Sequence, residues 1–80
     1  MKNNEIIKNE ISNQSRFYTD NRFCVNQRII DNKTIVFLNK KEADKYANKI
    51  KTYVYEIFIE RKISKTHFSK IQLYGYAVPK

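Results

Sequence analysis

Two segments in the second half of the sequence alternate between apolar and polar residues, and this alternation limits the fold more than any other feature. Residues 52–63 place four apolar or aromatic side chains on one face of an extended chain: Tyr53, Tyr55, Ile57 and Ile59. Residues 71–78 alternate in the same way before Pro79. A two-residue period is typical of half-buried β-strands. The sequence therefore predicts two strands that pair as an antiparallel hairpin, and Gly75 within the second predicts a bulge or a close backbone approach.

The two strands are connected by the basic stretch RKISKTHFSK, residues 61–70, which carries four positive charges and no acidic residue. It is longer than the about two to five residues that a hairpin loop usually needs. Packing of Ile63 and Phe68 on the core would point the polar side chains outward, namely Lys65, His67 and Lys70. The alternative is a short helix over residues 64–71, begun by a serine cap.

Residues 39–51 have the clearest helical pattern. Asn39 followed three residues later by Glu42 is the arrangement of a capping box. Apolar residues recur at helical spacing on one face, at Ala43, Tyr46, Ala47 and Ile50. The outer face carries a row of lysines at i+4 spacing, where like charges repel by about 0.2–0.5 kcal/mol per pair: Lys41, Lys45 and Lys49. The row is either a contact for an anionic partner or a solvated helix face.

The first half of the sequence predicts a short helix and a second hairpin. Residues 4–14 place three isoleucines at helical spacing, too few for a helix that is stable without docking on the domain. Residues 22–30 alternate as a strand does, with Cys24 buried within it, and residues 31–33 supply a turn. Residues 34–38 are apolar almost throughout, so we expect a central strand covered on both faces.

The predicted order is α-β-β-α-β-β, which indicates an α+β fold. We expect a single small domain in which an antiparallel sheet of about four strands has one or two helices packed on one face. Residues 1–14 are expected to form an N-terminal helix or arm, and residues 15–80 the α+β domain. A chain of 80 residues buries only about 60–65% of its unfolded surface, so its stability should be modest.

Composition argues against catalysis. Cys24 is the only thiol and His67 the only histidine, and one glycine leaves no glycine-rich phosphate loop. No cluster of histidines and cysteines provides a metal site, so we expect no metal and no cofactor.

The sequence also indicates where the protein acts. A single cysteine cannot form an internal disulfide, which favours a reducing cytoplasm. No apolar run reaches the about 18 residues of a membrane helix, so we expect no membrane association.

Charge and aromatic residues point instead to binding. Sixteen Lys and Arg against eight Asp and Glu give a net charge of +8, although coding from an AT-rich genome would also enrich lysine and asparagine. Cations alternate with aromatic rings, as in residues 16–18 and 22–23. Flat rings can stack on unpaired bases while cations contact phosphates. Tyrosines on alternate strand positions are equally suited to cross-strand packing or protein interfaces: Tyr53, Tyr55, Tyr74 and Tyr76.

Two functions follow as hypotheses. The first is a non-enzymatic binding protein, monomeric or a small homo-oligomer, that engages nucleic acid, a ribonucleoprotein or an acidic protein surface. Its predicted contacts are eight basic side chains: Lys41, Lys45, Lys49, Arg61, Lys62, Lys65, His67 and Lys70. The second is an inhibitor or adaptor that blocks a host protein, such as a defence nuclease, through its tyrosine-rich strands or an exposed sheet edge.

The sequence carries no motif of a known nucleic-acid-binding family. It lacks the aromatic signatures of ribonucleoprotein domains, a GXXG loop and a helix-turn-helix pair. A short, lysine- and asparagine-rich chain of this composition is typical of an accessory protein of a phage or a mobile element. A structural component of a particle or homo-oligomer is the third alternative.

Overall fold

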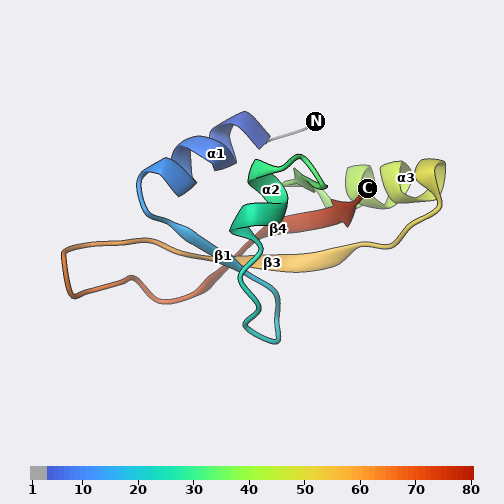
Figure 1. Cartoon of the computed structure of the whole chain (residues 1–80). Coiled ribbons are helices and arrows are strands. Elements are labelled where there is room, and N and C mark those ends of the chain that lie inside the picture. The colour runs from blue at the N-terminus through green and yellow to red at the C-terminus, as the bar shows by residue number, and fades with distance from the viewer. Residues whose placement is uncertain (1–3) are drawn as a thin grey trace.

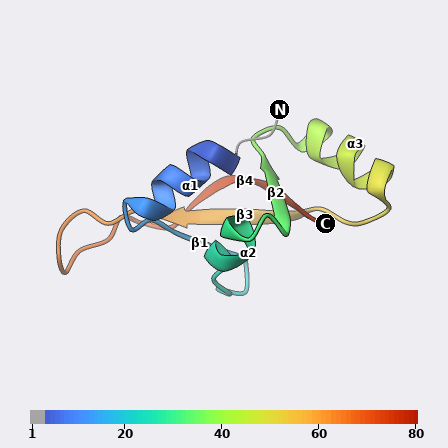
Figure 2. The same ribbon diagram turned by 45° about the horizontal axis from the view of Figure 1, so that its top comes forward.

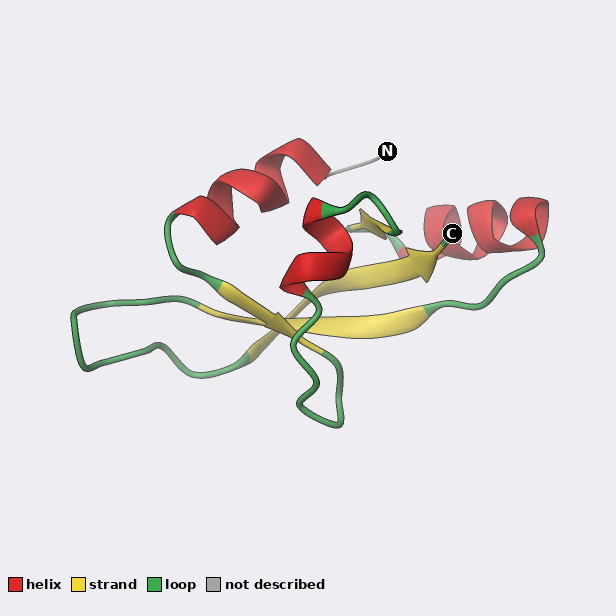
Figure 3. Ribbon diagram, in the orientation of Figure 1, coloured by secondary structure: helices red, strands yellow, loops and turns green. Residues whose placement is uncertain are grey.

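A computed structural model describes residues 4–80 and shows a four-stranded antiparallel sheet with helices packed against it (Figure 1; Figure 3). The predicted α+β class is therefore confirmed. The elements in chain order are α1 (Asn4–Ser12), β1 (Arg16–Tyr18), α2 (Asn26–Ile30), β2 (Thr34–Phe37), α3 (Lys40–Ile50), β3 (Tyr55–Glu60) and β4 (Gln72–Pro79).

The last strand of the chain lies inside the sheet, because the strand order is β1-β3-β4-β2. β4 pairs with β3 as the predicted hairpin, and on its other side with β2, where Ile35 lies opposite Val78. β2 was expected to be central and is instead an edge strand. Its four residues are nevertheless buried, as predicted, because helices cover both of its faces.

Side chains of β2 alternate between two hydrophobic clusters. Val36 faces the cluster formed with α1 and α2, whose other members are Ile7, Phe17, Val25, Ile29, Ile57, Ile59 and Ala77. Ile35 and Phe37 face a second cluster with Ala43, Ala47 and Val78, which holds α3 against the opposite face. Figure 2 shows α1 and α3 at opposite ends of the sheet. The first helix is therefore docked, since Ile7 is fully buried.

The helix α3 begins where the sequence predicts. The side chain of Asn39 accepts hydrogen bonds from the backbone N–H groups of Lys41 and Glu42, at 2.8 and 3.3 Å, and so caps the helix. Ala43 and Ala47 are buried, and their small side chains let the helix lie close to β2.

The predicted strand over residues 22–30 is wrong. Residues 26–30 form α2, and the strand that pairs with β3 is β1, a three-residue segment that the sequence pattern did not reveal. Val25 and Ile29 are four residues apart, so they lie on the same side of a helix, and both are buried. Phe23, which a strand would place on the same face as Val25, is 70% exposed.

Side-chain amides occupy the outer edges of both edge strands. Asn4 donates to the Thr34 carbonyl at 2.9 Å and accepts from the Val36 N–H at 3.0 Å. Asn26 does the same for β1, donating to the Ser15 carbonyl at 3.0 Å and accepting from the Phe17 N–H at 2.8 Å. Each amide thus satisfies a carbonyl and an N–H two residues apart, as a neighbouring strand would, and blocks that edge.

Gly75 lies at a β-bulge, as the sequence predicts. Ile57 pairs with Gly75 but Phe58 pairs with Leu73, so Tyr74 is the extra residue on β4. The backbone also approaches closely, because a Cβ atom built on Gly75 would lie 2.5 Å from the Phe37 carbonyl oxygen. Both expectations for this glycine are therefore confirmed.

Candidate functional site

Residues 61–71, here called the arm, form a hydrogen-bonded extension of the β3–β4 hairpin. The backbone N–H of Ser69 donates to the Arg61 carbonyl at 2.8 Å, and that of Ile63 donates to the His67 carbonyl at 2.9 Å. The short helix considered for this segment is therefore wrong. Figures 1 and 2 both show the arm projecting beyond the sheet at the end opposite α3.

The base of the arm is held by contacts with α1, with the turn that follows α1, and with β1. The Arg61 guanidinium donates to the Glu10 carboxylate at 3.1 Å, and the Lys62 ammonium donates to the Gln14 side chain. Arg16 lies over the Phe68 ring, 5.0 Å from its centroid, in a cation–π arrangement. These contacts orient the arm relative to the body of the protein.

The contact between Arg61 and Glu10 predicts a pH dependence of stability. The hydrogen bond from Arg61 lowers the pKa of Glu10. Such a group stabilises the folded state above its unfolded-state pKa of about 4.3, and this contribution disappears as the pH falls through the lower folded-state pKa. The variants Glu10→Gln and Arg61→Ala should each flatten the loss of stability between about pH 5 and pH 3.

Thermal unfolding of the wild type and both variants across this pH range measures the effect. Both side chains are partly exposed, so the difference at neutral pH should stay below about 1 kcal/mol. An acid profile that neither variant changes would contradict the prediction.

The tip of the arm is exposed and lacks carboxylates. Lys65, His67 and Lys70 point to solvent, as predicted. Ile63 was expected to pack on the core, but it is 70% exposed, because the hairpin carries it beyond the sheet. Phe68 is half-buried under Arg16. The arm therefore combines basic side chains with an exposed apolar one.

The eight predicted basic contacts divide into two groups. Arg61, Lys62, Lys65, His67 and Lys70 belong to the arm, whereas the exposed lysines of α3 lie at the other end of a molecule 41 Å long (Figure 1). The lysines of this second group are Lys41, Lys45 and Lys49. The structure therefore brings together the residues of each group but not the two groups.

The four predicted interface tyrosines do not form one surface. Tyr53 and Tyr55 lie together, with ring centroids 6.1 Å apart. Tyr74 packs edge-on against Phe17 at 5.2 Å, and Tyr76 packs in the cluster beneath α3. Because the bulge adds a residue at position 74, Tyr74 and Tyr76 lie on opposite faces of the sheet.

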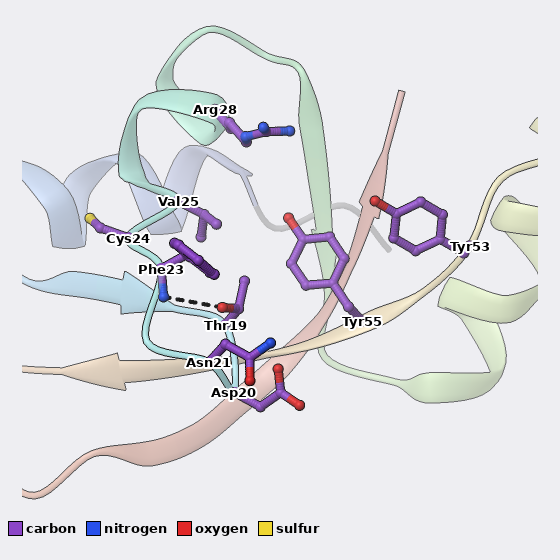
Figure 4. A pocket seen from close by; sticks show the side chains of 9 residues that line it. All are labelled: Thr19, Asp20, Asn21, Phe23, Cys24, Val25, Arg28, Tyr53 and Tyr55. Carbon is purple, nitrogen blue, oxygen red and sulfur yellow. Dashed lines mark hydrogen bonds between the residues drawn. The ribbon is translucent and has the colours of Figure 1, made fainter.

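An aromatic cleft of about 420 Å³ lies beside Tyr53 and Tyr55 (Figure 4). Figure 4 shows the two tyrosine rings on one side and Phe23 on the other, with Arg28 and Asp20 at opposite ends. The other lining residues are Thr19, Asn21, Cys24 and Val25. Burial raises the pKa of the Tyr55 phenol. The sequence showed the cation and ring at residues 22–23 but not this cleft, which forms from segments about 30 residues apart.

Cys24 was expected to be buried in a strand, and this is wrong. It is exposed, because the segment before α2 pairs with β1 only through an isolated bridge between Cys24 and Tyr18. Within residues 4–80, no three side chains of His, Cys, Asp or Glu are grouped as metal ligands. No helix in this range is both long and apolar enough to cross a membrane.

Comparisons of the chain with family models, with curated proteins and with solved structures find no match.

Proposed function

We propose that this protein is a non-enzymatic binding protein whose basic arm engages nucleic acid or a nucleic-acid-handling complex. The observation that carries the proposal is the arm itself, a hydrogen-bonded projection with four Lys and Arg side chains and no carboxylate. In this proposal the protein acts in the cytoplasm as an accessory factor of a phage or a mobile element.

The shape and chemistry of the arm suit a polyanion. A two-stranded ribbon fits the major groove of a duplex, and lysine and arginine side chains neutralise phosphates. The backbone bonds and the contact of Arg61 with Glu10 reduce the conformational entropy that binding would otherwise cost. Ile63, exposed near the tip, can contact base edges or sugars.

Two charge-reversal variants test this proposal. In one, Lys62, Lys65 and Lys70 of the arm are replaced by glutamate; in the matched control, the same change is made at Lys41, Lys45 and Lys49. Fluorescence anisotropy with labelled duplex DNA and single-stranded RNA of about 20 nucleotides measures affinity at low salt. We expect the arm variant to lose about 100-fold in affinity and the α3 variant to lose less than about threefold.

The salt dependence gives an independent measure of the contact. Arg61 is engaged by Glu10, so if the three lysines of the arm neutralise three phosphates of a duplex, affinity should fall about 40-fold between 50 and 200 mM salt. Contacts from both basic groups would give a steeper dependence, about 10³-fold or more. Salt-independent binding, or equal losses in the two variants, would rule out the arm as the nucleic-acid contact.

A further inference from the structure

The sheet has an open stretch of edge along the first half of β3. β1 pairs only with residues 58–60 of β3, through Tyr18 opposite Phe58 and Arg16 opposite Glu60. Residues 55–57 continue beyond the end of β1. This part of β3 therefore has no strand on the side away from β4.

The hydrogen bonds of β1 fix which backbone groups point to this open edge. Phe17 bonds outward, to Asn26 and Val25, so Phe17 and Ile59 form a pair that does not exchange hydrogen bonds. Phe58 therefore directs its N–H and C=O toward β1. Because the direction alternates along a strand, Glu56 directs its N–H and C=O to the same side, where β1 has already ended.

The opposite side of the sheet gives the same result. Thr34 and Val36 bond outward to Asn4, so Ile35 and Phe37 bond to β4. Tyr76 and Val78 then face β2, which leaves Gly75 and Ala77 to bond with Ile57 and Tyr55. Glu56 again faces away from β4. Glu56 therefore marks an open edge segment of β3, beside which the aromatic cleft lies.

The aromatic cleft opens beside this segment. Tyr55 lines it from β3, while Phe23 and Tyr53, which are 70% and 65% exposed, supply further apolar surface. Its volume of about 420 Å³ lies within the range of ligand pockets. Arg28 stands at one end and forms no ion pair within residues 4–80.

We propose that an extended, acidic peptide segment of a partner protein adds as a strand to β3 at Glu56. Its backbone bonds with the N–H and C=O of Glu56, its apolar or aromatic side chain enters the cleft, and its carboxylate contacts Arg28. Arg28 is the one cation among those of residues 4–80 that line the cleft, and Asp20 lies at the opposite end, so the carboxylate of the segment is expected at the Arg28 end. This site is separate from the arm, and the proposal does not depend on nucleic-acid binding.

The geometry favours a peptide over the other occupants. A strand presents a donor and an acceptor with the spacing that the N–H and C=O of Glu56 require, and one of its side chains can enter the cleft beside Tyr55. A second copy related by two-fold symmetry would place its own concave cleft against this one, so neither cleft would be filled by a side chain.

Hydrogen exchange in the free protein tests the open edge. The Glu56 amide should exchange at least tenfold faster than the Val36 and Phe17 amides, which also lie at strand edges but donate to the side chains of Asn4 and Asn26. A Glu56 amide as protected as these two would overturn the proposal.

Selection from a displayed library of random decapeptides identifies a probe, and a labelled copy of the selected peptide is then titrated. We expect sequences with an apolar or aromatic residue near a carboxylate, which slow exchange of the Glu56 amide on binding. Phe23→Ala and Arg28→Ala should each weaken binding at least tenfold, whereas Ile63→Ala, at an equally exposed residue of the arm, should leave it unchanged. Methylation of the peptide amide that faces the Glu56 carbonyl should abolish binding.

Three results would overturn the proposal: no peptide selected against the wild type, binding that Ile63→Ala weakens as much as Phe23→Ala, or binding that survives amide methylation. Competition by a single-stranded oligonucleotide for the same cleft, with Phe23→Ala weakening both ligands, would assign the cleft to nucleic acid instead.

Discussion

Replacement of Gly75 by alanine is expected to lower the free energy of unfolding by roughly 3 kcal/mol. The added Cβ would lie 2.5 Å from the Phe37 carbonyl oxygen and 3.4 Å from its carbonyl carbon, which are backbone atoms and cannot rotate away. β2 and β4 would have to separate, with strain in the adjoining cluster beneath α3. A domain of this size has a total stability of about 4–12 kcal/mol, so the loss would be large.

Urea denaturation at neutral pH, followed by circular dichroism, measures this loss. Gln72→Ala is the matched control, because it places alanine at an exposed position of the same strand. We expect the control to change stability by less than about 0.5 kcal/mol. Equal stability of Gly75→Ala and the wild type would show that β2 and β4 leave room for a side chain at this position.

Replacement of Asn26 by alanine should cost about 2–4 kcal/mol, because it leaves two partly buried backbone groups without partners. The Phe17 N–H and the Ser15 carbonyl both bond to this one amide. Asn26→Asp keeps the acceptor but sets a carboxylate oxygen against the Ser15 carbonyl, so it should also destabilise the protein. Without the Asn26 amide, backbone groups on the outer edge of β1 are exposed, so the variant protein should also self-associate through this edge.

Urea denaturation measures the stability change, and analytical ultracentrifugation measures association. Gln27→Ala is the control, since this neighbouring side chain donates only to Asp31 on the surface of α2. We expect it to cost less than about 0.5 kcal/mol. An Asn26→Ala protein as stable and as monomeric as this control would contradict the proposed role of the amide.

Local sequence patterns predicted the parts of the fold that depend on neighbouring residues. The capping asparagine and the alanines of α3 are four to eight residues apart, so about two helical turns contain the signal. The hairpin of β3 and β4 repeats its alternation over enough residues to be distinguished from chance. Gly75 was informative because a glycine inside a strand often marks a bulge or a close backbone approach.

The remainder of the fold depends on distant contacts. β1 is three residues long, and its position comes from Asn26 and from residues 58–60. The segment around Val25 and Ile29 fits both a strand and a helix, and the buried cluster with Ile7 and Phe17 decides for the helix. No local pattern contains that information.

In the candidate sites too, features that are contiguous in the sequence could be predicted, and features that depend on distant contacts could not. The charge of the arm could be predicted because it is contiguous in the sequence. The separation of the arm from the lysines of α3 could not, since it depends on the sheet order. The two-residue spacing of Tyr74 and Tyr76 predicted that both side chains lie on one face of the sheet. The single extra residue at the β-bulge places them on opposite faces instead.

The interior position of β4 has a consequence for synthesis on the ribosome. β2 emerges about 40 residues before the strand it pairs with, and β1 needs a β3 that is itself supported by β4. A nascent chain can form α3 locally, but it cannot assemble the sheet until residues 72–79 have left the exit tunnel. Until then the apolar residues of β2 have no strand partner, so this segment is where a chaperone would be expected to bind during translation.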